Sequence, residues 1–132
     1  MGHARLRLIE SGLPDYSAYS LLGRSILIRY LEDRDILTSE WIQNNTKRKY
    51  DNYISILDNI QDTLNIFNIL ESTLSGDLFP LTNYERNNLS LEQLRIAANF
   101  LQRVFKNYTG TVCEIFLLHS FDLYGWILSG LG

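Results

Sequence analysis

The sequence has little of what catalysis and metal binding usually require. Its 132 residues include one cysteine, Cys113, and two histidines, His3 and His119. A single cysteine forms no internal disulfide, which fits a reducing compartment, and two distant histidines argue against a zinc site. We expect His3 to be disordered, His119 to be a satisfied core or boundary histidine, and Cys113 to be a buried thiol without a partner base.

Phosphate-binding loops are also missing, because the chain contains neither a Gly-x-Gly-x-x-Gly sequence nor a Walker-type lysine motif. Carboxylate pairs such as Glu32 with Asp33, or Asp58 with Asp62, lack a positioning partner and are expected to be solvated faces or ion pairs. The sequence therefore predicts that this chain is not an enzyme by itself and that it holds no catalytic residue, metal or cofactor.

Positive charge is sparse. The net charge is −3, and the basic residues form only one cluster, Lys47, Arg48 and Lys49. A protein that binds DNA alone usually carries a basic stripe, because neutralising phosphates drives the affinity. A run of three basic residues at a helix start is more often a solvated face than a phosphate clamp. Any nucleic-acid role is therefore expected to be shared with other parts of the protein or with other chains.

No segment has the composition of a membrane anchor. Residues 1–5 lack the apolar run of a signal peptide. The apolar stretch 111–131 is long enough to span a bilayer, but Glu114, His119 and Asp122 interrupt it, and charges at such depths are costly. The sequence predicts a soluble, cytoplasmic protein without a membrane partner.

Helical spacing of aliphatic residues dominates the chain, and two prolines give it few breaks. This pattern predicts an all-α fold, an irregular bundle of four to five helices with an apolar C-terminal tail. Residues 1–110 are expected to form the helical domain. Residues 111–132 are expected to form a divergent tail, which can be interpreted as the start of an absent catalytic domain, as a strand followed by a helix, or as part of an incomplete module.

The first predicted helix spans residues 16–33. Asp15, after Pro14, is expected to cap it. Its residues are apolar nearly all round, which is typical of a central, buried helix, and Arg29 is placed to pair with Asp33. Thr38 or Ser39 is then expected to cap a short turn around Trp41 and Ile42, which residues 44–45 end.

The clearest periodicity spans residues 50–71 and predicts one amphipathic helix of about 25 residues, ending near residues 75–76. Its inner face consists of Tyr50, Tyr53, Leu57, Ile60, Leu64 and Phe67. Residues 77–89 have turn composition around Pro80 and Asn83. Ser90 and Gln93 then form a capping-box signature, which opens a last helix that closes near Gly110. The inner face of this helix consists of Leu94, Ala97, Ala98, Leu101, Val104 and Phe105.

Two short passages are more specific than a generic helix: GRSILIRYLEDRDILT at residues 23–38 and GDLFP at residues 76–80. In this order, about 40 residues apart, they resemble the helical segment that precedes the catalytic domain in many adenine-specific DNA methyltransferases of bacterial restriction–modification and related phage-defence systems. In that family an aliphatic, arginine-containing helix ends in Leu-Glu-Asp-Arg-Gly, and an Asn-Gly-Asp-Leu-Phe turn follows. Here Asp35 stands where glycine is common, and Ser75 stands where asparagine is common.

The resemblance covers residues of about 15 to 105 and implies a helical N-terminal domain, or a truncated remnant, that is not itself catalytic. Such methyltransferases bind S-adenosylmethionine on a glycine-rich strand–turn–helix and hold the flipped adenine with Asn-Pro-Pro-Tyr or Asp-Pro-Pro-Tyr. This chain has neither, since Pro14 and Pro80 are isolated. The resemblance therefore implies S-adenosylmethionine only for an attached catalytic domain. The sequence after residue 110 departs from the family.

The implied task is to hold DNA, or a partner subunit, against a catalytic domain. The candidates for contact with DNA or a partner are Arg24, Arg29, Arg34, Lys47, Arg48 and Lys49. A scaffolding role of the first passage is favoured over direct DNA contact. The alternative hypothesis is a stand-alone helical interaction module that forms homo-oligomers through its aromatic tail, where Tyr124 and Trp126 suit an interface.

Overall fold

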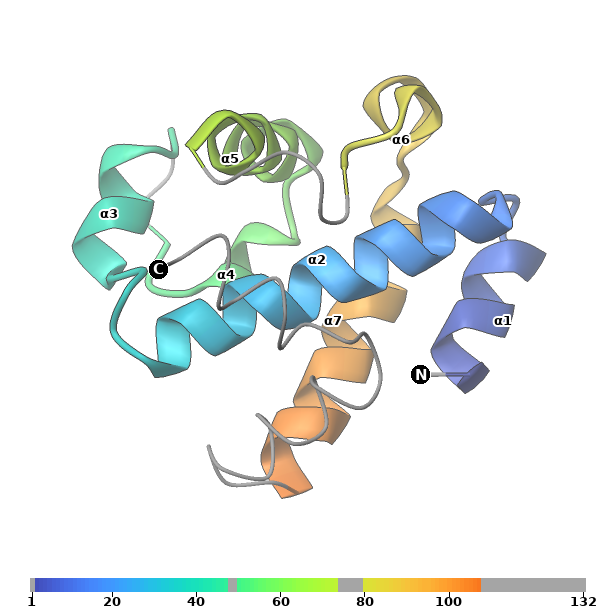
Figure 1. Cartoon of the computed structure of the whole chain (residues 1–132), viewed down its shortest axis with the longest axis horizontal. Helices are drawn as coiled ribbons and strands as arrows, with labels where there is room; N and C mark the ends of the chain where they lie inside the picture. The colour runs from blue at the N-terminus through green and yellow to red at the C-terminus, as the bar shows by residue number, and fades with distance from the viewer. Residues whose placement is uncertain (1, 48–49, 74–79, 108–132) are drawn as a thin grey trace.

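The computed structural model describes residues 2–47, 50–73 and 80–107 (Figure 1). Within these ranges the regular structure is helical throughout, which confirms the all-α prediction, although seven helices replace the expected four to five. The helices are α1 (Gly2–Glu10), α2 (Asp15–Asp33), α3 (Ser39–Asn44), α4 (Tyr53–Ile56), α5 (Ile60–Thr73), α6 (Asn83–Asn88) and α7 (Leu91–Asn107). The predicted tail at 111–132 and the predicted helix ends near residues 75–76 and at Gly110 lie outside the described residues.

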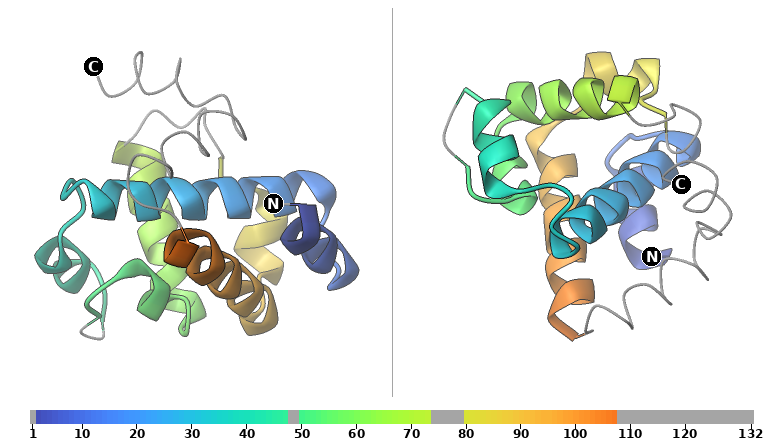
Figure 2. Two further views of the ribbon diagram at one scale, coloured as in Figure 1. Left: turned by 90° about the horizontal axis from the view of Figure 1, so that it is seen from below. Right: turned by 60° about the vertical axis from the view of Figure 1, so that its left-hand side comes forward.

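Helix α2 runs through the middle of the molecule and contacts α1, α4 and α7, as Figures 1 and 2 show. Its bounds confirm the first predicted helix. Because other helices pack against it on several sides, most of its surface is buried, which fits its apolar residues on nearly all sides. Twelve of its residues are buried: Ser17, Ala18, Ser20, Leu21, Leu22, Gly23, Arg24, Ser25, Ile26, Leu27, Ile28 and Leu31. The expected cap is wrong. Pro14 occupies the cap position without a side-chain hydrogen bond, and Asp15 forms an ion pair with Arg5 of α1 instead.

The C-terminus of α2 is closed by a Schellman motif. The amide of Ile36 donates to the carbonyl of Leu31 (2.9 Å) and the amide of Asp35 donates to that of Glu32 (3.0 Å). This arrangement requires a left-handed residue at the position after the cap, and Asp35 supplies it with φ = 58°. Glycine is the usual residue in this conformation, because a Cβ atom makes it strained.

Helix α1 was not expected from the sequence. His3 lies in this helix and is exposed, so the prediction of a disordered His3 is wrong. Ala4 and Leu8 lie one turn apart on its buried face. Gly12 closes α1 in the same way that Asp35 closes α2, with φ = 106°. The helix carries no strong capping signal, and it is stabilised by packing against α2 and α7.

The long helix predicted over residues 50–71 is wrong, because two asparagines start separate helices within it. Asn52 accepts the amide of Ser55 to cap α4, and Asn59 accepts the amide of Asp62 at 2.9 Å before α5. Asparagine competes with helical hydrogen bonding in this way, so it starts helices more readily than it continues them. The apolar period crosses the break, and Phe67 is still buried.

Side-chain caps determine the starts of α3, α6 and α7. Thr38 accepts the amide of Trp41, which confirms one of the two predicted caps of α3. Ser90 and Gln93 exchange hydrogen bonds at the start of α7, as predicted, and Leu94, Ala97 and Leu101 are buried on its inner face. The turn expected at 77–89 is partly wrong. Thr82 and Glu85 form a second capping box, which starts α6.

Candidate functional site

A buried ion pair joins α2 to α6. The Arg24 guanidinium donates from Nη1 to Oε2 of Glu85 at 2.8 Å and from Nη2 to Oε1 at 3.1 Å. Arg24 is 6% exposed and Glu85 is fully buried. Nη2 of Arg24 also donates to the Pro80 carbonyl at 3.0 Å, and the guanidinium carbon lies 4.5 Å from the centroid of the Phe67 ring. Two parallel hydrogen bonds make this the strong, bidentate form of an arginine–carboxylate pair.

The pair belongs to a larger polar network at the start of α6. Oε1 of Glu85 accepts the backbone amide of Thr82 at 3.2 Å and its hydroxyl at 3.1 Å. The Thr82 hydroxyl also shares a hydrogen bond of 2.8 Å with Ser17 of α2. These contacts correct the expectation that Arg24 reaches a phosphate, since its guanidinium is committed to Glu85 and Pro80 inside the protein.

This network also brings together the two short passages at residues 23–38 and 76–80 that the sequence singles out. Arg24 belongs to residues 23–38, and Pro80 ends the passage at residues 76–80. Their hydrogen bond spans 56 positions of the chain. The two sequence signals therefore meet at one junction, although the remaining residues of the second passage lie outside the described ranges.

A second polar junction lies further along α2. The buried hydroxyl of Tyr53 shares a hydrogen bond of 2.8 Å with Ser25, and the Tyr53 amide donates to Oε2 of Glu32 at 2.8 Å. Burial raises the pKa of the Tyr53 phenol, so this side chain stays neutral. Nη1 of Arg29 lies 3.8 Å from Oε1 of Glu32. Arg29 therefore forms an ion pair with Glu32, one turn further along α2.

Glu32 is a carboxylate in a poorly solvated position. Its side chain is 9% exposed, and burial raises its pKa more than the Tyr53 amide and the Arg29 charge lower it. Oε1 of Glu32 is buried without a hydrogen bond among the described residues. The Glu32 carboxylate thus positions both the segment around Tyr53, through the Tyr53 amide, and the side chain of Arg29, through the ion pair.

The remaining basic candidates lie in different surroundings. Arg34 is exposed directly after α2 and stacks over Tyr30, with 5.4 Å from its guanidinium carbon to the ring centroid. The exposed carboxylates of Asp33 and Asp35 flank it in the sequence and weaken its local positive potential. Lys47 has an exposed side chain, and its backbone amide donates to Asp62. Arg48 and Lys49 lie outside the described residues.

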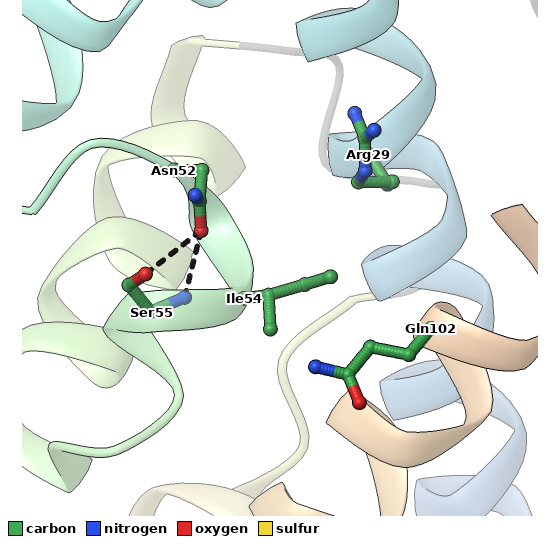
Figure 3. Close-up of a pocket in the computed structure, with 5 residues that line it drawn as sticks. All are labelled: Arg29, Asn52, Ile54, Ser55 and Gln102. Atoms are coloured by element: carbon green, nitrogen blue, oxygen red, sulfur yellow. Dashed lines mark hydrogen bonds between the residues drawn. The ribbon is translucent and has the colours of Figure 1, made fainter. Parts of the chain in front are cut away.

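Arg29 lines a pocket of about 360 Å³ between three helices (Figure 3). Asn52, Ile54 and Ser55 contribute the wall from α4 and its cap, and Gln102 contributes the facing wall from α7. Figure 3 shows Ile54 extending towards the space between Arg29 and Gln102. The sequence identified Arg29 but not the other four residues, because no local pattern indicates that these segments converge.

Elsewhere in the described ranges, no three histidine, cysteine, aspartate or glutamate side chains are grouped as metal ligands. None of the helices within those ranges is both long enough and apolar enough to cross a membrane. Comparisons of the chain with protein-family models, with curated proteins and with solved structures find no match.

Proposed function

We propose that this chain is a non-catalytic helical domain of an adenine-specific DNA methyltransferase of a restriction–modification or phage-defence system. Its role is to position DNA, or a partner subunit, against a catalytic domain that residues 1–132 do not contain. S-adenosylmethionine and the target adenine bind on that catalytic domain. The chain itself supplies rigid helices and a few basic side chains.

The observation that carries this proposal is the hydrogen bond between Arg24 and the Pro80 carbonyl. Each of the two passages that resemble the family is short, so their contact with each other is stronger support than either passage alone. A direct contact between them favours a common structural origin, because Arg24 and Pro80 are parts of one junction. The ion pair with Glu85 fixes this junction in a buried, neutral form.

The backbone of Asp35 gives independent support. The family commonly has glycine at this position, and here the residue adopts φ = 58°, a conformation in which glycine is favoured. Aspartate is one of the few other residues that tolerate it. Asp35 therefore keeps the left-handed backbone conformation that glycine would adopt at this position.

The charge distribution favours a shared contact with DNA over independent binding. Arg24 is neutralised by Glu85 inside the fold, which leaves Arg29, Arg34 and Lys47 as described contact candidates in a chain of net charge −3. A few phosphate contacts give weak, salt-dependent binding, so the catalytic domain must supply the rest of the affinity.

The coding sequence that follows the codon for Gly132 tests this proposal. We expect a glycine-rich strand–turn–helix and then an Asn-Pro-Pro-Tyr or Asp-Pro-Pro-Tyr sequence, either in the same reading frame, in a shifted frame or in the adjacent gene. The absence of both motifs from all three places would contradict the proposal.

A further inference from the structure

The pocket between α2, α4 and α7 is built from parts of the chain that are far apart in the sequence. Arg29 comes from α2, Asn52, Ile54 and Ser55 come from α4 and its cap, and Gln102 comes from α7 (Figure 3). A volume of about 360 Å³ is at the small end of the range of ligand sites. Four of the five lining side chains are polar. This composition differs from that of a packing defect, which is usually apolar.

The structure holds the wall of this pocket in place. Oδ1 of Asn52 accepts both the amide and the hydroxyl of Ser55 at 2.9 Å, which caps α4. The next residue, Tyr53, is fixed through its amide to Glu32, and the same carboxylate lies 3.8 Å from Arg29. Two of the three walls are thus tied together before any ligand arrives, which lowers the entropic cost of binding.

The chemistry of the lining defines what fits. Because Oδ1 of Asn52 already accepts two hydrogen bonds, this side chain can offer a ligand its Nδ2 donor. Gln102 offers a second amide, and Arg29 offers a guanidinium fork. The hydroxyl of Ser55 donates to Asn52, so Ser55 contributes to the shape of the wall and not a donor. Ile54 supplies the one aliphatic surface.

Charge restricts the ligand further. One arginine faces the pocket, and Glu32 behind it offsets part of its charge, so a singly charged anion suits the site better than a dianion. An uncharged apolar ligand would remove water from the charged guanidinium without adding an opposite charge, which is unfavourable. A phosphodiester has one negative charge, two oxygens that accept from donors, and an adjoining sugar with an apolar face.

We propose that this pocket binds one phosphodiester of a DNA strand. Arg29 and the amides of Asn52 and Gln102 donate to the phosphate oxygens, and Ile54 lies against the neighbouring deoxyribose. The choice of DNA as the source of the phosphodiester rests on the proposed function, whereas the match to a singly charged phosphodiester rests on the pocket alone.

The exposed face of α7 extends this site. Arg95, Asn99, Gln102 and Arg103 are exposed and follow one another at helical spacing, so they share one face of the helix. From Arg95 to Gln102 this face rises about 10 Å along the axis. Glu92 is the carboxylate on the same face, one turn before Arg95. The DNA strand whose phosphodiester enters the pocket therefore continues along α7, past the guanidinium groups of Arg95 and Arg103.

The test is a nuclear magnetic resonance titration of the full chain, labelled with nitrogen-15, with the dinucleotide TpT. We expect saturable shifts of the Asn52 and Gln102 side-chain amides and of the Arg29 Nε–H. A methylphosphonate TpT, which lacks the backbone charge, should produce no such shifts. Arg29→Gln is expected to weaken TpT binding by at least about tenfold, because it removes a charged hydrogen-bond donor.

Two further variants separate the pocket from general charge effects. Gln102→Glu places a negative charge in the pocket without altering Arg29 or Glu32, and it should abolish the shifts of the Asn52 amide and the Arg29 Nε–H. Arg7→Gln removes the same charge from the exposed face of α1, outside the pocket, and should leave TpT affinity unchanged. The backbone spectrum of each variant checks that it is folded.

Equal binding of the methylphosphonate, or equal weakening by Arg7→Gln and Arg29→Gln, would overturn the pocket proposal. The ribodinucleotide UpU adds a third arm: clearly tighter binding of UpU than of TpT would show an RNA site and would also overturn it. None of these results bears on the coding sequence after Gly132, so failure of the pocket and failure of the proposed function can be told apart.

Discussion

The buried ion pair between Arg24 and Glu85 predicts a characteristic pattern of stability changes. Arg24→Met removes both guanidinium hydrogen bonds to Glu85 and the one to the Pro80 carbonyl, and it leaves the fully buried Glu85 carboxylate with the two donors of Thr82. Breaking a buried pair from one side typically costs about 3–5 kcal/mol, because the remaining charge is left without compensation in a poorly solvated place. We therefore expect Arg24→Met to lower the free energy of unfolding by about that amount.

The reverse change should cost at least as much. Glu85→Leu leaves the Arg24 guanidinium with the Pro80 carbonyl and the Phe67 ring, and it also removes the capping box of α6, which is worth about 1 kcal/mol. The double variant Arg24→Met/Glu85→Leu removes both charges. Replacing a whole buried pair by apolar residues is often neutral or stabilising. We expect the double variant to lie within about 2 kcal/mol of the wild type, far less than the sum of the single losses.

Urea unfolding followed by far-ultraviolet circular dichroism measures these differences. Arg5→Met is the matched control, because it breaks the exposed pair with Asp15 and should change stability by less than about 1 kcal/mol. Glu85→Gln keeps the shape and one acceptor oxygen, so it provides a milder variant if the others unfold. A loss for Arg24→Met no larger than that for Arg5→Met, or a double variant that loses the full sum of the single losses, would refute this role of the buried pair.

Three further predictions concern single positions. Asp35→Gly should be about 1 kcal/mol more stable to urea than Asp35→Ala, because only glycine adopts φ = 58° without strain; equal stabilities would contradict the left-handed backbone. Tyr53→Phe should lose about 1–3 kcal/mol in the same assay, because Ser25 keeps a buried hydroxyl without its partner, and a loss near zero would argue against that hydrogen bond. Glu32→Gln tests the raised pKa of Glu32. Folding favours the protonated form of Glu32, so protonation stabilises the wild type relative to this variant. The difference in unfolding free energy between the two should be highest below the ordinary pKa of 4.5 and should fall as pH rises through the folded-state pKa. A difference that stays constant across that pH window would contradict the raised pKa.

Local signals in the sequence were sufficient to predict much of the helical framework. Helix α2 follows from its unbroken apolar pattern, and the start of α7 follows from Ser90 and Gln93, whose hydrogen bonds match the predicted capping box. The prediction of one helix over residues 50–71 is wrong because the side-chain caps at Asn52 and Asn59 interrupt the apolar periodicity. The apolar spacing continues through Asn59, and periodicity alone does not reveal that this side chain starts a new helix.

The candidate site was much less predictable. An apolar pattern on all sides of α2 gives no means of telling which arginine points inwards, so Arg24 and Arg29 looked equivalent. Arg24 is buried because Glu85, 61 positions later, lies opposite it. The pocket likewise depends on α4 and α7 both packing against α2, which lets Asn52 and Gln102 line one space, and no local sequence signal predicts this packing.

Isothermal titration calorimetry of the full chain with S-adenosylmethionine, in the presence of duplex DNA, is the most direct test of a helical domain without its own catalytic machinery. A DNA methyltransferase titrated in parallel shows that the cofactor and the DNA are competent. We predict no saturable heat of S-adenosylmethionine binding by this chain and no methyl transfer to the duplex. Saturable binding of S-adenosylmethionine by residues 1–132 would contradict that claim.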